Sequence, residues 1–221
     1  MIEIKNLSKK FGDLTVLENI SFTANGVLGV CGNAGSGKST LLRIIAGNIP
    51  ATEGEVLING NEISAKAVGY LPEGAPTFNE LTAYEFLAFI GQAKKISEEK
   101  LFRQIDEVIE LAELSHVKDV YIRHLSPNDR KTLGIAATLL GNPKVVVLDE
   151  PFVDLDTHGL SIIRAIIKML GEIKTVVISA KNSADLSGIC DDILTLASKQ
   201  PESEIELDAE EDEEEEEEDN E

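Results

Sequence analysis

Residues 32–40 limit the fold of this chain more than any other stretch of its sequence. They combine glycines and small side chains with a lysine and two hydroxyl groups, in the order Gly32, Asn33, Ala34, Gly35, Ser36, Gly37, Lys38, Ser39, Thr40. Glycines let the backbone curl so that successive N–H groups point at one anion, and a following helix turns its N-terminal dipole toward the same charge. The pattern predicts a phosphate-binding loop, with Lys38 on the β- and γ-phosphates of a nucleoside triphosphate and the Ser39 hydroxyl on Mg²⁺.

The residues on either side of this loop support the prediction. An apolar run, Val27–Cys31, precedes the loop, and Leu41–Ala46 follows it with helical spacing. A glycine-rich turn that binds nothing is the alternative interpretation. Strand, loop and helix in this order are the setting that a phosphate-binding loop requires, so the context favours nucleotide binding.

A pair of carboxylates forms the second candidate site. Asp149 and Glu150 directly follow the apolar run Val145–Leu148. In open α/β sheets, ligands bind at the carboxyl ends of the parallel strands, which is where these acids would lie. Asp149 is placed to hold Mg²⁺, and Glu150 to orient or deprotonate an attacking water. The alternative, a strand that simply ends in solvated acids, is common for an acidic pair without an upstream phosphate loop.

The charge of the chain is concentrated at its C-terminus. The net charge of the 221 residues is −20, and 15 of the acidic residues lie between Glu202 and Glu221. The rest of the chain has 25 acidic and 20 basic residues and no basic stripe, so we expect no nucleic-acid partner. We expect the low-complexity segment 200–221 to be disordered. It is either a solvated, solubilising tail or an electrostatic arm for a basic surface on a partner.

Cysteine usage and hydropathy bear on location. Cys31 and Cys190 sit in apolar surroundings and are interpreted as small core residues in a reducing compartment. Residues Met1–Lys5 form no apolar secretion segment, and no apolar run approaches the ~18 residues that span a membrane. Any membrane part of the system is therefore expected on another chain.

The pattern of apolar residues predicts an α/β fold in one nucleotide-binding lobe, residues 1–72 plus 141–199, interrupted by a helical lobe at about 73–140. One helical pattern runs from Thr82 to about Ala112 and another from Ser126 to Leu140. Ser126 suits the N-cap, Pro127 the first helical position, and Asp129 would complete a capping box. Strands are predicted at Thr15–Leu17, Ile20–Phe22, Glu55–Ile58, Val68–Pro72, Val145–Leu148, Thr175–Ile178 and Ile193–Leu196.

Taken together, these motifs resemble those of the ATP-binding-cassette (ABC) ATPases over essentially all of residues 1–199. Leu125-Ser126 stands where the signature segment of that family begins, and Gly69–Glu73 matches the loop that senses the γ-phosphate and touches the membrane partner. Glu150–Asp156 matches the segment that carries the inter-subunit aspartate. The resemblance implies a P-loop ATPase domain, 1–199, with a RecA-like core, a small antiparallel β subdomain and a helical subdomain at about 73–140.

The resemblance also implies roles for residues outside the phosphate loop. Glu73, in place of the usual Gln, would act beside the γ-phosphate and Mg²⁺ as a catalytic residue together with Lys38 and Glu150. Ser126 and Asp156 would meet the nucleotide at the subunit interface. Phe11 would stack on adenine, with an ordinary edge-strand aromatic as the alternative.

The resemblance implies an ATPase subunit that powers a membrane transporter. Two such subunits, in a homodimer or a heterodimer, would face head to tail with each ATP between one phosphate loop and the other signature segment. Their closure would move a separate transmembrane permease. Residues 69–73, followed by Leu81–Leu87, look most like the exporter branch. The chain would then be cytoplasmic, peripheral to the inner face of the cell membrane through the permease.

Two departures from the family pattern predict weak hydrolysis. The signature should read Leu-Ser-Gly-Gly-Gln, but here Pro127, Asn128 and Asp129 follow Ser126. Pro127 has no N–H to donate, and Asp129 adds a negative charge near another anion, which costs on the order of 1–4 kcal/mol. Lys181 replaces the histidine that bonds the γ-phosphate; it either offers charge to that phosphate or is a solvated surface residue. A chain with this pattern would bind ATP but hydrolyse it poorly alone.

Two other functions remain open on the sequence. The first is a soluble ABC-type regulator or assembly factor, an ATP-gated binding module without a transporter. The second is a different phosphate-loop kinase or GTPase. A GTPase would need an Asn-Lys-x-Asp motif for base recognition, which residues 181–184 do not supply.

Overall fold

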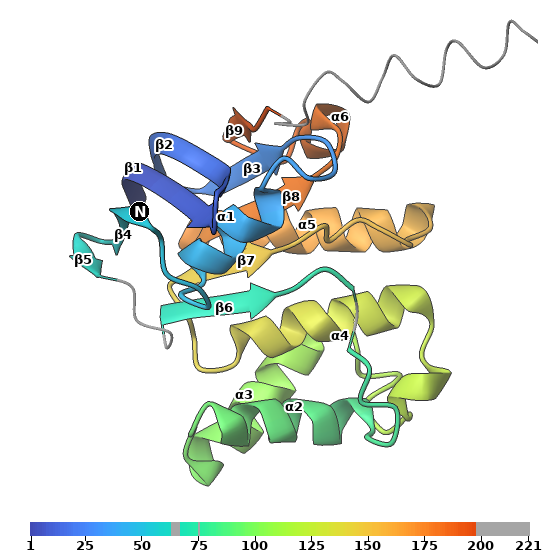
Figure 1. Cartoon of the computed structure of the whole chain (residues 1–221). Coiled ribbons are helices and arrows are strands. Elements are labelled where there is room, and N and C mark those ends of the chain that lie inside the picture. The colour runs from blue at the N-terminus through green and yellow to red at the C-terminus, as the bar shows by residue number, and fades with distance from the viewer. Residues whose placement is uncertain (63–66, 75, 198–221) are drawn as a thin grey trace, which may run out of the picture.

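The computed structural model describes residues 1–62, 67–74 and 76–197. Its strands form two sheets, one parallel with the order β6-β7-β8-β3-β9 and one antiparallel with the order β2-β1-β4-β5 (Figure 1). The disorder predicted for 200–221 concerns residues outside the described part. Among the described residues, no helix combines the length and the apolar character needed to cross a bilayer.

The parallel sheet is the centre of the molecule. Its strands are β3 (Val27–Cys31), β6 (Val68–Leu71), β7 (Val145–Leu148), β8 (Thr175–Ala180) and β9 (Asp192–Thr195). Every residue of β3, β7 and β8 is buried, as expected when both faces of a parallel sheet are covered. The predicted strands at 68–72, 145–148, 175–178 and 193–196 all correspond to strands of this sheet.

The antiparallel sheet covers one face of the parallel sheet, with helix α1 (Lys38–Ile45) between them. Its strands are β1 (Ile2–Phe11), β2 (Leu14–Ala24), β4 (Glu53–Ile58) and β5 (Asn61–Glu62). The two strand pieces predicted within residues 15–22 belong to the single strand β2. Asn59 and Gly60 both have positive φ, 51° and 76°, which is the backbone of a tight hairpin turn, and they connect β4 to β5.

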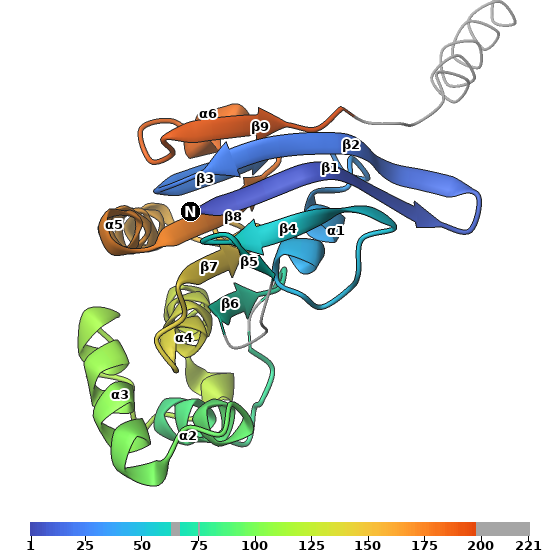
Figure 2. The same ribbon diagram turned by 90° about the vertical axis from the view of Figure 1, so that its left-hand side faces the viewer.

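Helices cover the other face of the parallel sheet and extend away from it (Figure 2). They are α2 (Ala83–Ala93), α3 (Glu98–Leu111), α4 (Pro127–Leu139), α5 (Thr157–Ile173) and α6 (Ser183–Leu186), with a 3-10 turn at Ile122–His124. Successive side chains of β7 point to opposite faces of the parallel sheet. Val145 and Val147 pack with α1 and the antiparallel sheet, whereas Val146 and Leu148 pack with the helices of the other face.

The prediction of one helical pattern from Thr82 to Ala112 was wrong in its continuity. Helix α2 ends near Lys94, Lys95 adopts a φ of 58°, and α3 begins after Ser97. The Lys94 ammonium donates to the carbonyls of Ala137, Thr138 and Leu140 at 3.1, 3.2 and 2.8 Å, which ties this turn to the end of α4. The sequence marks this break, because residues 94–100 contain one apolar side chain and Ser97 followed by two glutamates is typical of a helix start.

The N-terminus of α4 differs from prediction in one detail. Ser126 is the N-cap and accepts a hydrogen bond from the Asp129 N–H at 3.1 Å, as predicted. The Asp129 carboxylate, however, accepts from the Ser126 hydroxyl at 2.6 Å and makes no reciprocal capping bond among the described contacts. The box needs the longer side chain of Glu or Gln to reach back to the N-cap amide, and Asp is one methylene too short.

Candidate phosphate-binding and catalytic site

The predicted site residues gather at one edge of the parallel sheet. The loop 32–40 follows β3, Asp149 and Glu150 follow β7, and Lys181 follows β8. Strands β3 and β8 pair with Cys31 opposite Ala180, and β7 and β8 pair with Leu148 opposite Ile178. Since these strands are parallel and in step, their carboxyl ends bring the three segments together.

Lys38 occupies the centre of this arrangement. It is only 6% exposed. Its Nζ donates to the carbonyl oxygens of Gly32 at 2.7 Å and Asn33 at 3.2 Å, and lies 3.4 Å from Glu150 Oε1. A buried cation requires such compensation. Two residues predicted from separate motifs, the loop lysine and the strand-end glutamate, are therefore in contact.

The loop itself has the features of an anion cradle. A Cβ at position 32 would collide with the Ser36 hydroxyl, so only glycine fits there. The Ser36 Oγ is buried and has no hydrogen-bond partner among the described residues. A buried polar atom without a partner is costly and calls for an explanation. A phosphate oxygen lying in the loop would accept the hydrogen bond that this hydroxyl lacks.

A small cavity lies over the second half of the loop. Its volume is about 180 Å³, and it is lined by residues 35–40 and by Val16 of β2. Gly37 has a φ of 93°, and a Cβ there would press on the Val16 and Leu17 side chains. Sequence reasoning missed Val16, because a lone valine in a strand carries no chemical signal.

Ser179 is a second residue that sequence reasoning missed. Its fully buried hydroxyl donates to Asp149 Oδ1 at 2.6 Å and accepts from the Glu150 N–H at 2.8 Å. Glu150 has a φ of 47°, a backbone conformation that non-glycine residues adopt at a cost. The bond from Glu150 to Ser179 holds that conformation and orients both acids. The sequence predicts the strand that ends beside Ser179. It does not indicate that the Ser179 side chain contacts Asp149 and Glu150, about 30 positions earlier in the chain.

The oxygen donors present fit Mg²⁺ bound together with a nucleotide. Mg²⁺ is typically held by one or two protein carboxylates plus substrate phosphates. The Asp149 carboxylate is 2% exposed and lies at the same sheet edge as the loop that carries Ser39. Among the described residues, no group of three or more His, Cys, Asp and Glu side chains is arranged to hold a metal. A site completed by phosphate oxygens agrees with this donor set.

Comparison with known proteins identifies the family. Residues 17–153, more than half of the chain, match the family model described as ABC transporter. The chain belongs to the ABC transporter ATPases. It is the ATP-binding subunit of such a transporter, and the family match assigns ATP binding and hydrolysis to it. The predicted α/β P-loop fold is confirmed.

Individual relatives agree with the family match. The chain is 33% identical over 198 residues to an uncharacterized ABC transporter ATP-binding protein of Methanocaldococcus jannaschii, covering 88% of this chain and 73% of that protein. It is 30% identical to the lipopolysaccharide export ATP-binding protein of Escherichia coli strain K12 (85% and 83% covered) and 32% identical to a sulfate/thiosulfate import ATP-binding protein of Mesostigma viride (91% and 60%). A solved dimeric bacterial ABC transporter cassette superposes with a TM-score of 0.78 at 26% identity, covering 91% and 97% of the two chains.

Three residues whose roles are implied by the ABC family are exposed and are not among the described residues that contact Lys38. Phe11 is 50% exposed at the end of β1, and Lys9 Nζ lies 4.8 Å from its ring centroid. Lys181 is exposed, and its carbonyl accepts from the Cys31 thiol at 3.5 Å. Glu73 follows β6 and is also exposed. Among the described residues, none of these three side chains has a hydrogen bond to the phosphate loop.

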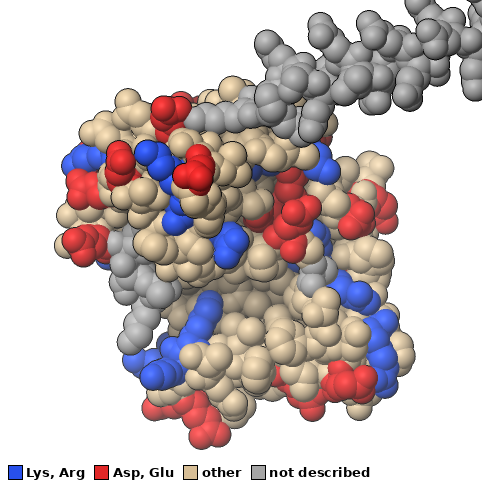
Figure 3. All heavy atoms as spheres, viewed as in Figure 1, with Lys and Arg blue, Asp and Glu red and all other residues tan. Residues whose placement is uncertain are grey.

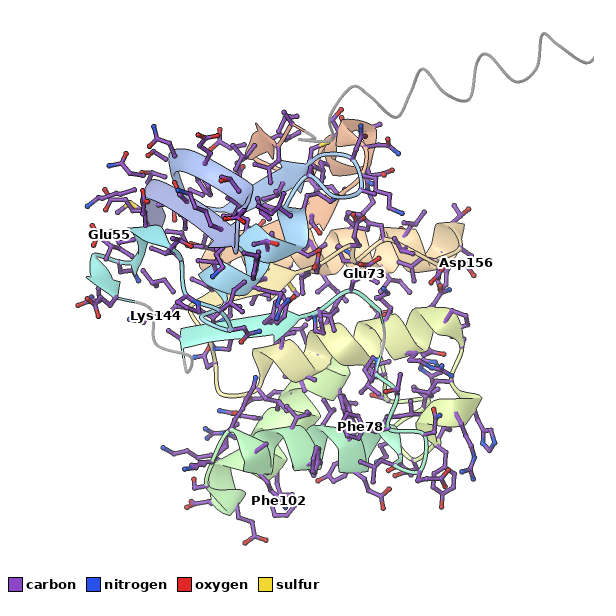
Figure 4. The ribbon with its side chains drawn as sticks, in the orientation of Figure 1. Glu55, Glu73, Phe78, Phe102, Lys144 and Asp156 are labelled. Carbon is purple, nitrogen blue, oxygen red and sulfur yellow. The ribbon has the colours of Figure 1, made fainter. Side chains whose placement is uncertain are left out.

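Asp156 and the altered signature segment meet within the ABC subunit. Asp156 caps α5, accepting from the Gly159 N–H at 2.8 Å and from Asn128 Nδ2 at 2.8 Å. The Gly159 bond, followed by the Asn128 bond, lowers the pKa of the Asp156 carboxyl. A Cβ at Gly159 would overlap the Asn128 amide, so glycine makes room for this pair. Figure 4 shows Glu73 and Asp156 on the same side of the molecule, where β6 and β7 lead into their loops.

Proposed function

We propose that this ABC subunit binds Mg-ATP in the loop 32–40 and drives a separate membrane permease of the exporter branch. One observation carries the proposal: the buried Lys38 ammonium contacts both the Gly32 carbonyl and the Glu150 carboxylate, and in the same loop the buried Ser36 hydroxyl has no partner among the described residues. A phosphate cradle and an acid suited to activate water are thus joined in one site. The relatives include proteins named for export and one named for import, so the exporter branch rests on the resemblance of residues 69–73 and Leu81–Leu87.

Each residue of this site has its own role in phosphoryl transfer. Lys38 and the loop N–H groups would hold the β- and γ-phosphates, and Ser39 and Asp149 would hold Mg²⁺, which would neutralise charge on the phosphate oxygens. Glu150 orients the attacking water and accepts its proton, with Glu73 beside the γ-phosphate. Lys38 Nζ lies 3.4 Å from Glu150 Oε1, so the cation that would bind the phosphates and the acid that would activate the water are neighbours.

The second half of each site comes from a second subunit. In this proposal two ATPase subunits face head to tail, and Ser126 of one contacts the γ-phosphate held by the other. Phe11 stacks on adenine, Asp156 lies at the subunit interface, and Lys181 faces the γ-phosphate. Solved relatives described as dimers, one of them bound to ADP and phosphate, support this arrangement.

The altered signature makes the hydrolysis of the isolated chain weak. The Ser126 hydroxyl donates to Asp129 Oδ2 at 2.6 Å, a bond that it has to give up before it can donate to an incoming phosphate. Pro127 contributes no N–H, and the Asp129 carboxylate brings a negative charge to the same place. The weakness therefore lies in the contact that this chain offers to the nucleotide of its partner.

Restoring the consensus residues is expected to raise the hydrolysis rate. We predict that Pro127→Gly, Asn128→Gly, Asp129→Gln and Lys181→His combined increase the single-turnover rate of the purified chain by about tenfold or more, the effect of removing roughly 1.4 kcal/mol of barrier. Asp119→Asn is the control, since it removes one exposed acid that lies outside the signature segment. An unchanged rate in a variant that still folds and binds ATP would show that the altered signature and Lys181 do not slow hydrolysis.

An apolar groove beside Glu73 is the surface that suits the permease. It has a volume of about 510 Å³ between the loop that follows β6 and helices α2 and α4. Phe78 lines it, 45% exposed, with its ring centroid 5.4 Å from those of Phe86 and Phe89. Figure 3 shows a hollow in the middle of this face of the molecule, and the atoms of its floor belong mainly to uncharged residues. A partner helix with apolar side chains would fit it.

Two exposed phenylalanines of similar exposure allow a matched test of docking. Phe78 lies at the groove, whereas Phe102, 47% exposed, lies on α3 away from it (Figure 4). We expect Phe78→Ser to reduce co-purification with a polytopic membrane protein from solubilised membranes by at least about tenfold, because aromatic anchors carry most of the binding energy of an interface. Phe102→Ser should leave recovery near that of the wild type. Equal recovery for both variants would overturn the docking site, and recovery of no membrane protein with the wild type would favour the soluble regulator.

A further inference from the structure

Lys131 is a buried cation that the phosphate site does not use. It lies on α4 and is 3% exposed. An ammonium offers three donors, but among the described contacts Lys131 Nζ has a single hydrogen bond, to the Gly74 carbonyl at 3.3 Å. No carboxylate of the described residues comes within the 4.0 Å of an ion pair. Lysines are rarely buried to this degree without a charged partner.

Three acids surround this cation at longer range. Burial lowers the pKa of Lys131, and the carboxylates of Asp154, then Glu73 and Glu150, act in the opposite direction. Glu73 belongs to the loop after β6, whereas Glu150 and Asp154 belong to the segment between β7 and α5. The bond to the Gly74 carbonyl at 3.3 Å places the Lys131 ammonium against the loop after β6, one residue from Glu73.

We infer that Lys131 is a positioning residue that neutralises the acidic group of Asp154, Glu73 and Glu150 and thereby lets the site favour ATP over ADP. The second half of this inference rests on the proposed function, which places the γ-phosphate beside Glu150 and Glu73. Lys38 compensates Glu150 directly at 3.4 Å, whereas neither Asp154 nor Glu73 has an ion pair among the described residues. Without it, three carboxylates would repel the γ-phosphate, the group that ATP has and ADP lacks.

A double-mutant cycle without nucleotide tests the charge coupling. The variants are Lys131→Met, Asp154→Asn and the two combined; Asp154 has a φ of 66°, which asparagine tolerates. We expect Lys131→Met to lower the urea midpoint of unfolding more in the chain with Asp154 than in the chain with Asn at that position. The matched cycle with Asp119→Asn should be additive. Additivity in both cycles would overturn the proposed charge coupling.

Nucleotide titration tests the preference for ATP. With Mg²⁺ present, fluorescent ATP and ADP analogues are titrated into the wild type, Lys131→Met, and Lys131→Met combined with Glu73→Gln. We expect Lys131→Met to weaken ATP binding about tenfold more than ADP binding, which is the scale of partly screened charges several Å apart. Adding Glu73→Gln should restore part of the preference. Equal losses for both nucleotides, as a merely structural role predicts, would overturn this part of the inference. If the wild type bound neither nucleotide, the preference and the proposed function would fail together, whereas the coupling measured in urea would stand.

Discussion

Substituting Glu150 by glutamine is expected to slow hydrolysis of bound ATP by about 10²–10⁴-fold, the usual contribution of a positioned general base. The amide keeps the shape of the side chain but cannot accept the proton of the attacking water. Because the Glu150 N–H is held by the Ser179 hydroxyl at 2.8 Å, the backbone should keep its place in the variant. Single-turnover hydrolysis, in the wild-type chain and in the variant with a consensus signature, measures the effect.

Binding should behave differently from hydrolysis in the Glu150→Gln variant. Removing a carboxylate 3.4 Å from Lys38 Nζ leaves that cation free for phosphate, so ATP affinity should be retained or increased. Glu172→Gln, at an exposed position near the end of α5, is the matched control and should change neither quantity. A hydrolysis rate equal to that of the wild type would remove Glu150 from its proposed role.

Substituting Lys38 by methionine is expected to weaken ATP binding by about 30-fold to several thousand-fold. That range corresponds to a loss of roughly 2–5 kcal/mol when one partner of a buried charge pair is removed. Lys38 is the one loop side chain with a positive charge, and it is buried beside the carbonyls that form the cradle. Equilibrium titration with a fluorescent ATP analogue measures the affinity.

The Lys38→Met variant also leaves the buried Glu150 carboxylate without its cation, which destabilises the fold. Lys38→Met combined with Glu150→Gln removes that cost, so loss of ATP binding in the double variant reports on the phosphate contact. Lys168→Met, at an exposed position on α5, is the matched control. Unchanged ATP affinity in a folded Lys38→Met variant would show that the nucleotide lies elsewhere.

The features that sequence predicted best are local in the chain. The loop 32–40 and the pair Asp149 and Glu150 carry their chemistry in consecutive residues, and the strands before them are short apolar runs. The meeting of the two motifs followed from the rule that ligands bind at the carboxyl ends of parallel strands. The contact of Lys38 with Glu150 at 3.4 Å is the outcome of that rule in this chain.

The features that sequence missed depend on contacts between distant residues. The Ser179 hydroxyl meets Asp149 only because β7 and β8 are neighbours in the sheet, and Lys131 meets the Gly74 carbonyl only because α4 packs beside β6. In the signature segment, Asn128 stands where the family has glycine, and the structure gives its amide a bond to Asp156.

We propose that this ABC ATPase holds Mg-ATP in a complete loop but hydrolyses it slowly alone because its signature segment is altered. Single-turnover hydrolysis by the purified wild-type chain, measured beside a cassette with the consensus Leu-Ser-Gly-Gly-Gln and the consensus histidine, tests this most directly. We predict that ATP is bound and that its hydrolysis is at least about tenfold slower than in the consensus cassette. A rate equal to that of the consensus cassette would show that the altered signature does not slow hydrolysis.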